Sequence, residues 1–237
     1  MRISNSNLYY RDVFLGHHAA GLALSRMEPK LSLGWWVGAA LWPDLLWAVF
    51  LYTGCEQVRV EPGATAVTPL DFARYPWSHS LLMMAVWATL AAGAGWLVAR
   101  RKRAAVGLAV AVFSHWALDA LSHRPDLPLW PRGPLVGLGL WNYRAATVAL
   151  EAGLFLAAAA LYLRRTRATG AVGGWAAWAY LGFVALIAVG SWFGPPPPDR
   201  GAIVATGLAA WLFPVWAGWF DERRQPLAQT NSSSTGA

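Results

Sequence analysis

Hydrophobic residues gather along the chain into long runs that short polar segments separate. Most of the long runs have 18 or more residues, enough to cross a hydrocarbon core about 30 Å thick as a helix rising 1.5 Å per residue. A shorter apolar stretch at 13–25 contains His17 and His18 and lacks the cleavage site of a signal peptide, so we expect a short helix packed in the bundle. The six long runs are 33–53, 80–99, 104–122, 145–163, 174–193 and 202–219.

This pattern predicts an all-α fold, a polytopic membrane helix bundle of about six long transmembrane helices plus a short N-terminal helix. We expect one transmembrane domain over 1–222, with the metal-site part at 13–144, and a disordered tail at 223–237. The composition agrees, because 57% of the 237 residues are hydrophobic and 13% are charged. Soluble domains have about 45–50% and about 25%. The lone Cys55 excludes a disulfide framework.

The basic residues fall mainly in the loops that would face one side of the bundle. The net charge of +7 would suit nucleic-acid binding, but four of these loops hold 11 of the 19 Lys and Arg residues. By the positive-inside rule we expect these loops and the C-terminus to be cytoplasmic in a multi-pass membrane protein. We therefore expect membrane lipids as partners and no nucleic acid. The 11 residues are Arg26, Lys30, Arg100, Arg101, Lys102, Arg103, Arg164, Arg165, Arg167, Arg223 and Arg224.

Ionisable residues inside membrane spans are costly and usually mark function. His115, Asp119 and His123 are spaced i, i+4 and i+8, so they share one helix face. One ion can bind His115 and Asp119 together, whereas His123 lies about 12 Å further along the axis than His115. His123 could serve a second ion bridged by Asp119, or it could satisfy the C-terminal end of the helix.

A tight hairpin should bring a further histidine, His79, to the same height along the bundle as Asp119 and His123. Runs 80–99 and 104–122 are joined by only four basic residues, so their helices should be antiparallel neighbours. Because the two arms have similar lengths, His79 should lie level with Asp119 and His123. The alternative is that His79 is a solvated loop residue.

A second hairpin should bring Asp44 to the same height in the bundle as His17. Pro43 breaks or kinks the first long run at Asp44. A turn at 26–32 then returns Asp44 to the level of His17, and a simple ion pair with a histidine is the alternative role. The residues that could converge at the outward ends of the two hairpins are His17, Asp44, His79, His115 and Asp119, with His18 and His123 in reserve.

Histidine and carboxylate ligands together suit zinc, manganese or iron. The sequence therefore predicts a divalent metal centre with one or two ions, in which His123 is a further candidate ligand. Asp44 and Asp119 are the candidate catalytic residues, as ligand and base. The centre faces the periplasmic or extracellular side, because the cytoplasmic loops lie at the other end.

Several motifs carry a resemblance to known proteins. A group of bacterial multi-pass membrane proteins has the same motifs, and the layout more distantly resembles the YdjM-like inner-membrane metal-dependent hydrolases. That family is similar in turn to zinc-dependent phospholipase C and P1 nuclease. The motifs lie at residues 16–23 (Gly-His-x-Ala-x-Gly-Leu-Ala), 68–72 (Thr-Pro-Leu-Asp-Phe), 75–81, 114–128 and 137–142.

The resemblance implies a zinc-type metal centre that activates water on a phosphoester, and it favours His17 over His18. The chain departs from the family's Pro-Asp-x-Asp motif, because Leu45 and Leu46 follow Asp44 and the second aspartate is missing, and Ser78 replaces threonine. No His-x-x-x-Glu motif follows. The ligands that the resemblance implies are His17, Asp44, His79, His115 and Asp119.

We therefore predict an integral membrane metal-dependent hydrolase that acts on a phosphoester or another small or lipid-like substrate at the outer membrane interface. Arg124 and Arg144 in the adjoining loop, with Arg132, could hold a phosphate or could be ordinary solvated charges. A transporter or permease is one alternative, although the inner halves of the runs contain almost no ionisable residue. A non-catalytic membrane protein with a structural metal site is the other.

Overall fold

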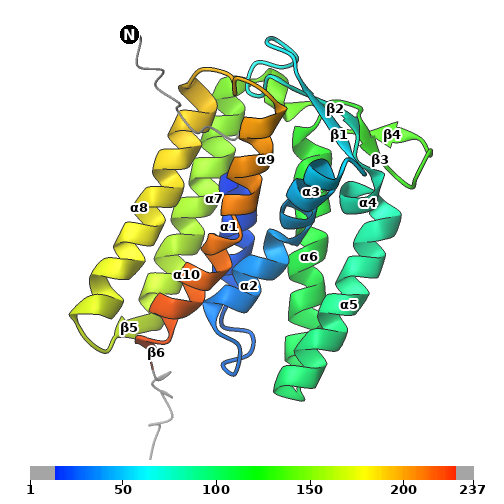
Figure 1. The fold of residues 1–237 in the computed structure, drawn as a ribbon. Coiled ribbons are helices and arrows are strands. Elements are labelled where there is room, and N and C mark those ends of the chain that lie inside the picture. Colours follow the sequence, from blue (N-terminus) through cyan, green and yellow to red (C-terminus); the bar gives the residue numbers. More distant parts are fainter. Residues whose placement is uncertain (1–13, 228–237) are drawn as a thin grey trace, which may run out of the picture.

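The computed structural model describes residues 14–227 as a bundle of helices that run between two ends of the molecule (Figure 1). Within these residues, five helical segments are long and apolar enough to cross a membrane, and a bent helix pair makes a sixth if it is one span. The chain is thus an all-α multi-pass membrane protein, as predicted. The five segments are α5 (Leu81–Ala99), α6 (Lys102–Ser122), α7 (Arg144–Arg165), α8 (Ala171–Phe193) and the pair α9 (Arg200–Ala209) and α10 (Leu212–Asp221).

The bent pair is α2 (Leu33–Ala40) and α3 (Trp42–Thr53), whose axes differ by 58°. Pro43 lies in the first turn of α3, where its missing N–H is tolerated but cannot continue the hydrogen bonds of α2. The predicted break before Asp44 is confirmed. It places Asp44 in the first turn of α3, with its side chain directed into the bundle and buried.

The short helix α1 (Phe14–Leu24) packs inside the bundle against α2, α6 and α7. Its 11 residues span about 16 Å, roughly half of a hydrocarbon core. Nearly every side chain of its first two turns is buried, His17 and His18 included. This agrees with the predicted short helix packed in the bundle.

Polar segments cap the two ends of the bundle (Figure 1). One end, the upper one in Figure 1, carries two antiparallel hairpins, the single-turn helix α4 (Pro76–His79) and the 3₁₀ helix η1 (Leu140–Asn142). The opposite end carries the α1–α2 loop, the α5–α6 turn and a third strand pair. The strand pairs are β1 (Gln57–Val60) with β2 (Leu70–Arg74), β3 (Leu127–Pro128) with β4 (Leu135–Val136), and β5 (Thr166–Ala168) with β6 (Arg224–Pro226).

The predicted tail at 223–237 is only partly described. Its first residues form β6, which pairs with β5 and so continues the fold, and residues 228–237 lie outside the described residues. The basic loops predicted to share one side do lie at one end of the bundle (Figure 1).

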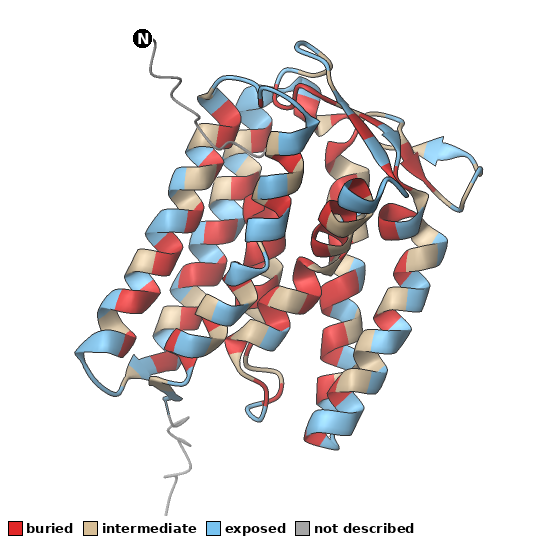
Figure 2. Ribbon diagram, in the orientation of Figure 1, coloured by how far each residue is buried: buried red, intermediate tan, exposed pale blue. Residues whose placement is uncertain are grey.

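Figure 2 shows that buried residues line the faces that the helices turn toward one another. The outward faces are exposed and yet apolar, as for Leu90, Leu97 and Leu186, which are 58%, 63% and 67% exposed. Exposed apolar surface on this scale is unusual for a soluble protein. It fits helices whose outer faces contact hydrocarbon.

Candidate metal centre

Three histidines and two aspartates meet inside the bundle, near the end that carries α4. His17 comes from α1, Asp44 from α3 and His79 from α4, whereas His115 and Asp119 lie one turn apart on α6. All five side chains are buried. The convergence that the two hairpins predicted is therefore present, and His79 is not a solvated loop residue.

The imidazoles of His79 and His115 lie at the middle of this cluster, each close to one oxygen of both aspartates. Two overlapping groups have ligand atoms within 4.8 Å of one another and could each hold an ion: His17 with Asp44 and His115, and His79 with His115 and Asp119. The Nε2 atoms of His79 and His115 lie 3.4 Å apart. His79 Nε2 is 3.4 Å from Asp44 Oδ1 and 3.7 Å from Asp119 Oδ2. His115 Nε2 is 3.5 Å from the same oxygen of Asp44 and 3.3 Å from the same oxygen of Asp119.

The fifth member, His17, completes the cluster from the side of α1. Its Nε2 lies 3.2 Å from Asp119 Oδ1, and its ring stacks on that of His115 with centroids 3.6 Å apart. Within the described part of the chain, neither ring nitrogen of His17 nor Asp119 Oδ2 makes a hydrogen bond. Buried polar atoms without hydrogen bonds are expensive, so these atoms need another partner.

The geometry and the charge both fit a divalent cation. Nitrogen and oxygen ligands lie about 2.0–2.2 Å from zinc, so in a tetrahedron they lie about 3.3–3.6 Å from one another. The separations around His79 and His115 fall close to this interval. Two buried carboxylates carry two negative charges, which one divalent ion would balance. The donor set of imidazole and carboxylate also suits zinc, manganese or iron.

The bend between α2 and α3 orients one of the two central imidazoles. His115 Nδ1 lies 2.8 Å from the Ala40 carbonyl oxygen. Because a carbonyl can only accept, Nδ1 carries the proton and Nε2 keeps its lone pair for the centre. Ala40 is the last residue of α2, so the break that places Asp44 also provides this acceptor.

A buried carboxylate lies behind the other central imidazole. Glu56 is fully buried, accepts hydrogen bonds from the backbone N–H groups of Trp77 and Ser78, and accepts a third from the Ser78 hydroxyl. Ser78 Oγ in turn lies 2.7 Å from His79 Nδ1. Burial raises the pKa of the Glu56 carboxyl, and the hydrogen bonds from Ser78 act in the opposite direction. Nothing in the sequence singled out Glu56, because it lies in a polar loop where carboxylates are ordinary.

The two reserve histidines have other contacts. His18 Nδ1 lies 2.9 Å from the hydroxyl of Tyr180, and the His18 ring packs edge-on against Phe14. His123 is the C-cap residue that follows α6, and its Nδ1 lies 2.8 Å from Asp126 Oδ1. Its role as a ligand of a second ion stays a prediction, and the proposal below rests on the other five residues.

Both arginines predicted to bind substrate are held by the loops around them. Arg124 pairs with Asp71 at 2.6 Å and with Asp126 at 3.1 Å. Arg144 Nε donates to the Ala66 carbonyl oxygen at 2.9 Å. A role for either residue in binding a phosphate stays a prediction.

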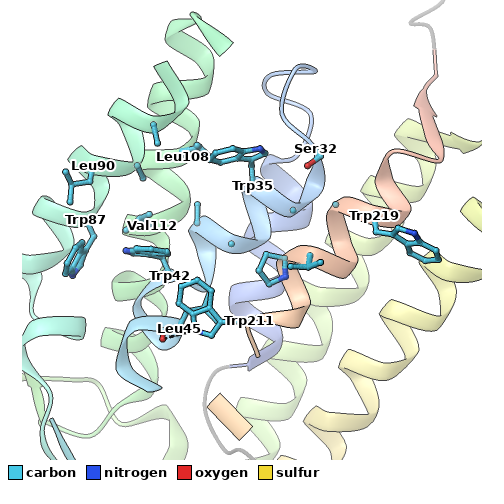
Figure 3. Close-up of a pocket in the computed structure, with 18 of the residues that line it drawn as sticks. Ser32, Trp35, Trp42, Leu45, Trp87, Leu90, Leu108, Val112, Trp211 and Trp219 are labelled. Atoms are coloured by element: carbon cyan, nitrogen blue, oxygen red, sulfur yellow. Dashed lines mark hydrogen bonds between the residues drawn. The ribbon is translucent and has the colours of Figure 1, made fainter. Parts of the chain in front are cut away.

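Two cavities lie beside the cluster. The smaller one, of about 30 Å³, is lined by Asp44, Thr206 and apolar side chains. This volume can hold a water molecule. The larger one is a groove of about 750 Å³, the size of a small-molecule site. Figure 3 shows Trp42, Trp87 and Trp211 among the side chains that line it.

The groove and the cluster share the α2–α3 corner. Leu45, next to Asp44, lines both cavities, and Val112 lines the groove one turn before His115. The rest of the lining is mainly apolar and comes from α2, α5, α6 and the α9–α10 segment. The groove is therefore an apolar space whose lining includes neighbours of Asp44 and His115, although no residue of the cluster itself lines it.

Comparison with curated proteins and with solved structures found no match. The model of one family, described as YdjM inner membrane protein, matches residues 12–194. The matched range runs from α1 to α8 and includes all five residues of the cluster. The resemblance to the YdjM family that the motifs predicted is thus confirmed, and the chain belongs to the YdjM inner membrane protein family.

Proposed function

We propose that the protein is a metal-dependent hydrolase embedded in the inner membrane. The observation that carries the proposal is the pair of central imidazoles, His79 and His115. Each lies 3.3–3.7 Å from one oxygen of Asp44 and one of Asp119, close to the separation of two ligands of the same zinc ion. His17 would be the fifth contact. Zinc is the proposed metal, and manganese or iron would suit the same donors.

Asp44 is the proposed general base. Its side chain is the most exposed of the five, at 11%, and it lines the cavity that can hold a water molecule. A bound divalent ion would lower the pKa of a water molecule toward about 7 and would stabilise negative charge on a phosphoester. Asp119 holds His17 and His115 in place from the opposite side.

A substrate with an acyl chain fits the surroundings of the cluster best. The groove is lined mainly by apolar and tryptophan side chains, and its rim includes Leu90 and Val215, which are 58% and 67% exposed on the outer face of the bundle. A lipid could therefore enter sideways from the bilayer. This supports a phosphoester lipid over a fully water-soluble ester.

The buried surroundings of the cluster give less support to a transporter. Between the cluster and the basic end of the bundle, the buried side chains of α5 and α6 are apolar, among them Met84, Leu108 and Val112. An ion path would need polar groups there. A structural metal site is the second candidate, favoured by exposed fractions of 0% and 3% for the side chains of His115 and Asp119.

We propose that the C-terminus is cytoplasmic and that the centre lies toward the periplasmic side. The basic loops lie at one end of the bundle, and the end that carries α4 lies opposite (Figure 1). The positive-inside rule then gives the orientation. A fluorescent protein that folds only in the cytoplasm, fused after the last residue, should fluoresce; a dark fusion at normal expression would reverse the orientation.

Hydrolysis is tested with phosphomonoesters and phosphodiesters, each with and without an acyl chain, in detergent or nanodiscs. We expect zinc-loaded protein to cleave an acyl-bearing ester, a chelator to abolish cleavage, and Asp44→Asn to lower kcat about 10²–10⁴-fold, the usual effect of losing a general base. Arg59→Ala, a variant at an exposed position of β1, is the control. If protein with bound zinc cleaves none of the esters, the metal is structural and the hydrolase proposal fails.

A further inference from the structure

Two successive hydrogen bonds connect the Nδ1 atom of His79, through the Ser78 hydroxyl, to the buried carboxylate of Glu56. His79 Nδ1 lies 2.7 Å from Ser78 Oγ, and Ser78 Oγ lies 2.6 Å from Glu56 Oε2. Glu56 has an exposed fraction of 0%. Its other oxygen accepts from the backbone N–H groups of Trp77 and Ser78 at 2.7 and 2.9 Å.

The direction of the protons in this chain follows from counting donors. A serine hydroxyl has one proton, and here it is donated to the Glu56 carboxylate. Ser78 Oγ can then only accept from His79, so the proton of the imidazole lies on Nδ1. His79 Nε2 is left as a lone pair, and Nε2 is the atom that faces Asp44, His115 and Asp119.

We propose that Glu56 is a positioning residue of the metal centre, which acts through Ser78 to fix the tautomer and the orientation of His79. This inference rests on the proposed function, because it needs a metal at Nε2. Metal-bound histidines commonly donate their second ring N–H to a carboxylate or carbonyl, and losing that partner typically lowers metal affinity 10- to 100-fold. In this protein the serine hydroxyl lies between the histidine and the carboxylate.

Glu56 also has a structural role that the test must separate from positioning. It ties the segment after α3 to the first residues of α4 through two backbone hydrogen bonds. Its removal could therefore loosen α4 as a whole. Glu56→Gln keeps the shape and one acceptor oxygen for those two N–H groups, so it changes mainly the group that faces Ser78.

Glu56→Gln should reverse the donor and the acceptor in both hydrogen bonds that Ser78 makes. The amide nitrogen that this substitution introduces would donate to Ser78 Oγ, and the hydroxyl would then donate to His79 Nδ1. The imidazole proton moves to Nε2, which can no longer bind a cation. We expect the dissociation constant for Zn²⁺, measured by competition with a chromophoric chelator, to rise about 10- to 100-fold.

Glu28→Gln is the matched control. Glu28 is also buried, but it accepts from the backbone N–H of Lys30 in the α1–α2 loop at the opposite end of the bundle. The Zn²⁺ affinity of this variant should stay within about threefold of native. Thermal unfolding of the metal-free proteins shows whether either substitution loosens the fold.

Two substitutions of Ser78 keep the test decisive if Glu56→Gln folds poorly. Ser78→Ala removes the link while leaving the Glu56 backbone contacts, and it should weaken Zn²⁺ binding as much as Glu56→Gln does. Ser78→Thr keeps a hydroxyl and should restore affinity to within about threefold of native. The double variant should be no worse than Ser78→Ala alone, because the two residues act in series.

The outcomes separate the two proposals. If the native protein binds Zn²⁺ and both Glu56→Gln and Ser78→Ala bind it as tightly, Glu56 is only structural and this inference is wrong. If the variants lose affinity only in proportion to a fall in unfolding temperature, the inference is equally wrong. If the native protein itself binds no Zn²⁺, the proposed function fails and takes this inference with it.

Discussion

His17 and His18 are neighbours on one helix, but their side chains contact different parts of the bundle. The two side chains are adjacent in sequence and both are buried, but successive helical residues point about 100° apart. His17 therefore reaches Asp119, whereas His18 reaches Tyr180. Hydrophobic spacing alone could not choose between them, and only the family resemblance favoured His17.

This difference predicts a matched pair of variants. His17→Ala removes a member of the cluster and should weaken Zn²⁺ binding at least tenfold, because a ligand or close contact of the ion is lost. His18→Ala removes an imidazole of equal burial that bonds only to Tyr180 among the described residues. The Zn²⁺ affinity of this second variant should remain within about threefold of native. Equal losses in the two variants would show that the effect is general loosening of α1.

At the residue scale, the sequence could predict those residues of the cluster whose side chains are unusual in the segment that contains them. His115 and Asp119 stand out because imidazole and carboxylate are rare inside an apolar span. Glu56 did not stand out, because it follows α3 in a polar loop, and its burial depends on α4 folding back over it. Its role in the site is a property of tertiary contacts and leaves no local pattern.

At the scale of elements, the hairpin argument succeeded because arm lengths fix which ends meet. The α5–α6 hairpin brings His79 within 3.7 Å of Asp119, as its equal arms predicted. His79 itself belongs to the separate turn α4, since Ser80 caps the start of α5. The break between α9 and α10 was not predicted. Pro214 lies in the first turn of α10, as Pro43 lies in the first turn of α3, and it cannot donate a hydrogen bond to the Ala210 carbonyl oxygen where α9 ends.

The contact between α2 and α10 depends on a small residue. A Cβ added at Gly34 would lie 2.4 Å from the Pro214 carbonyl oxygen, so the helices would have to separate. We expect Gly34→Ala to cost about 1–3 kcal/mol and to lower the unfolding temperature in detergent. At Gly93 on α5 an added Cβ meets nothing within 4 Å, so Gly93→Ala should leave the unfolding temperature unchanged or slightly higher. Similar unfolding temperatures for both variants would contradict the close packing of α2 on α10.

At the scale of the whole molecule, the apolar composition predicted a membrane protein. The loop charges predicted which loops share one end of the bundle, and these loops do lie at one end. Periodicity could not show the groove, because a groove forms where helices fail to meet, and that depends on tilt and on the bend at Pro43. Leu45, next to Asp44, and Val112, one turn before His115, line this groove, whereas none of the five clustered residues does. The bundle therefore combines a buried polar cluster with a separate groove lined mainly by apolar side chains.

The central claim is that the cluster of His17, Asp44, His79, His115 and Asp119 is a metal centre. Metal content of the purified protein, measured by plasma mass spectrometry after removal of loosely bound ions, tests it most directly. We predict about one divalent ion per chain, zinc in preference, and almost none in His115→Ala combined with Asp119→Ala, which removes two of the four central ligand atoms. A native protein without bound metal, or a double variant that keeps its full metal content, would contradict the account.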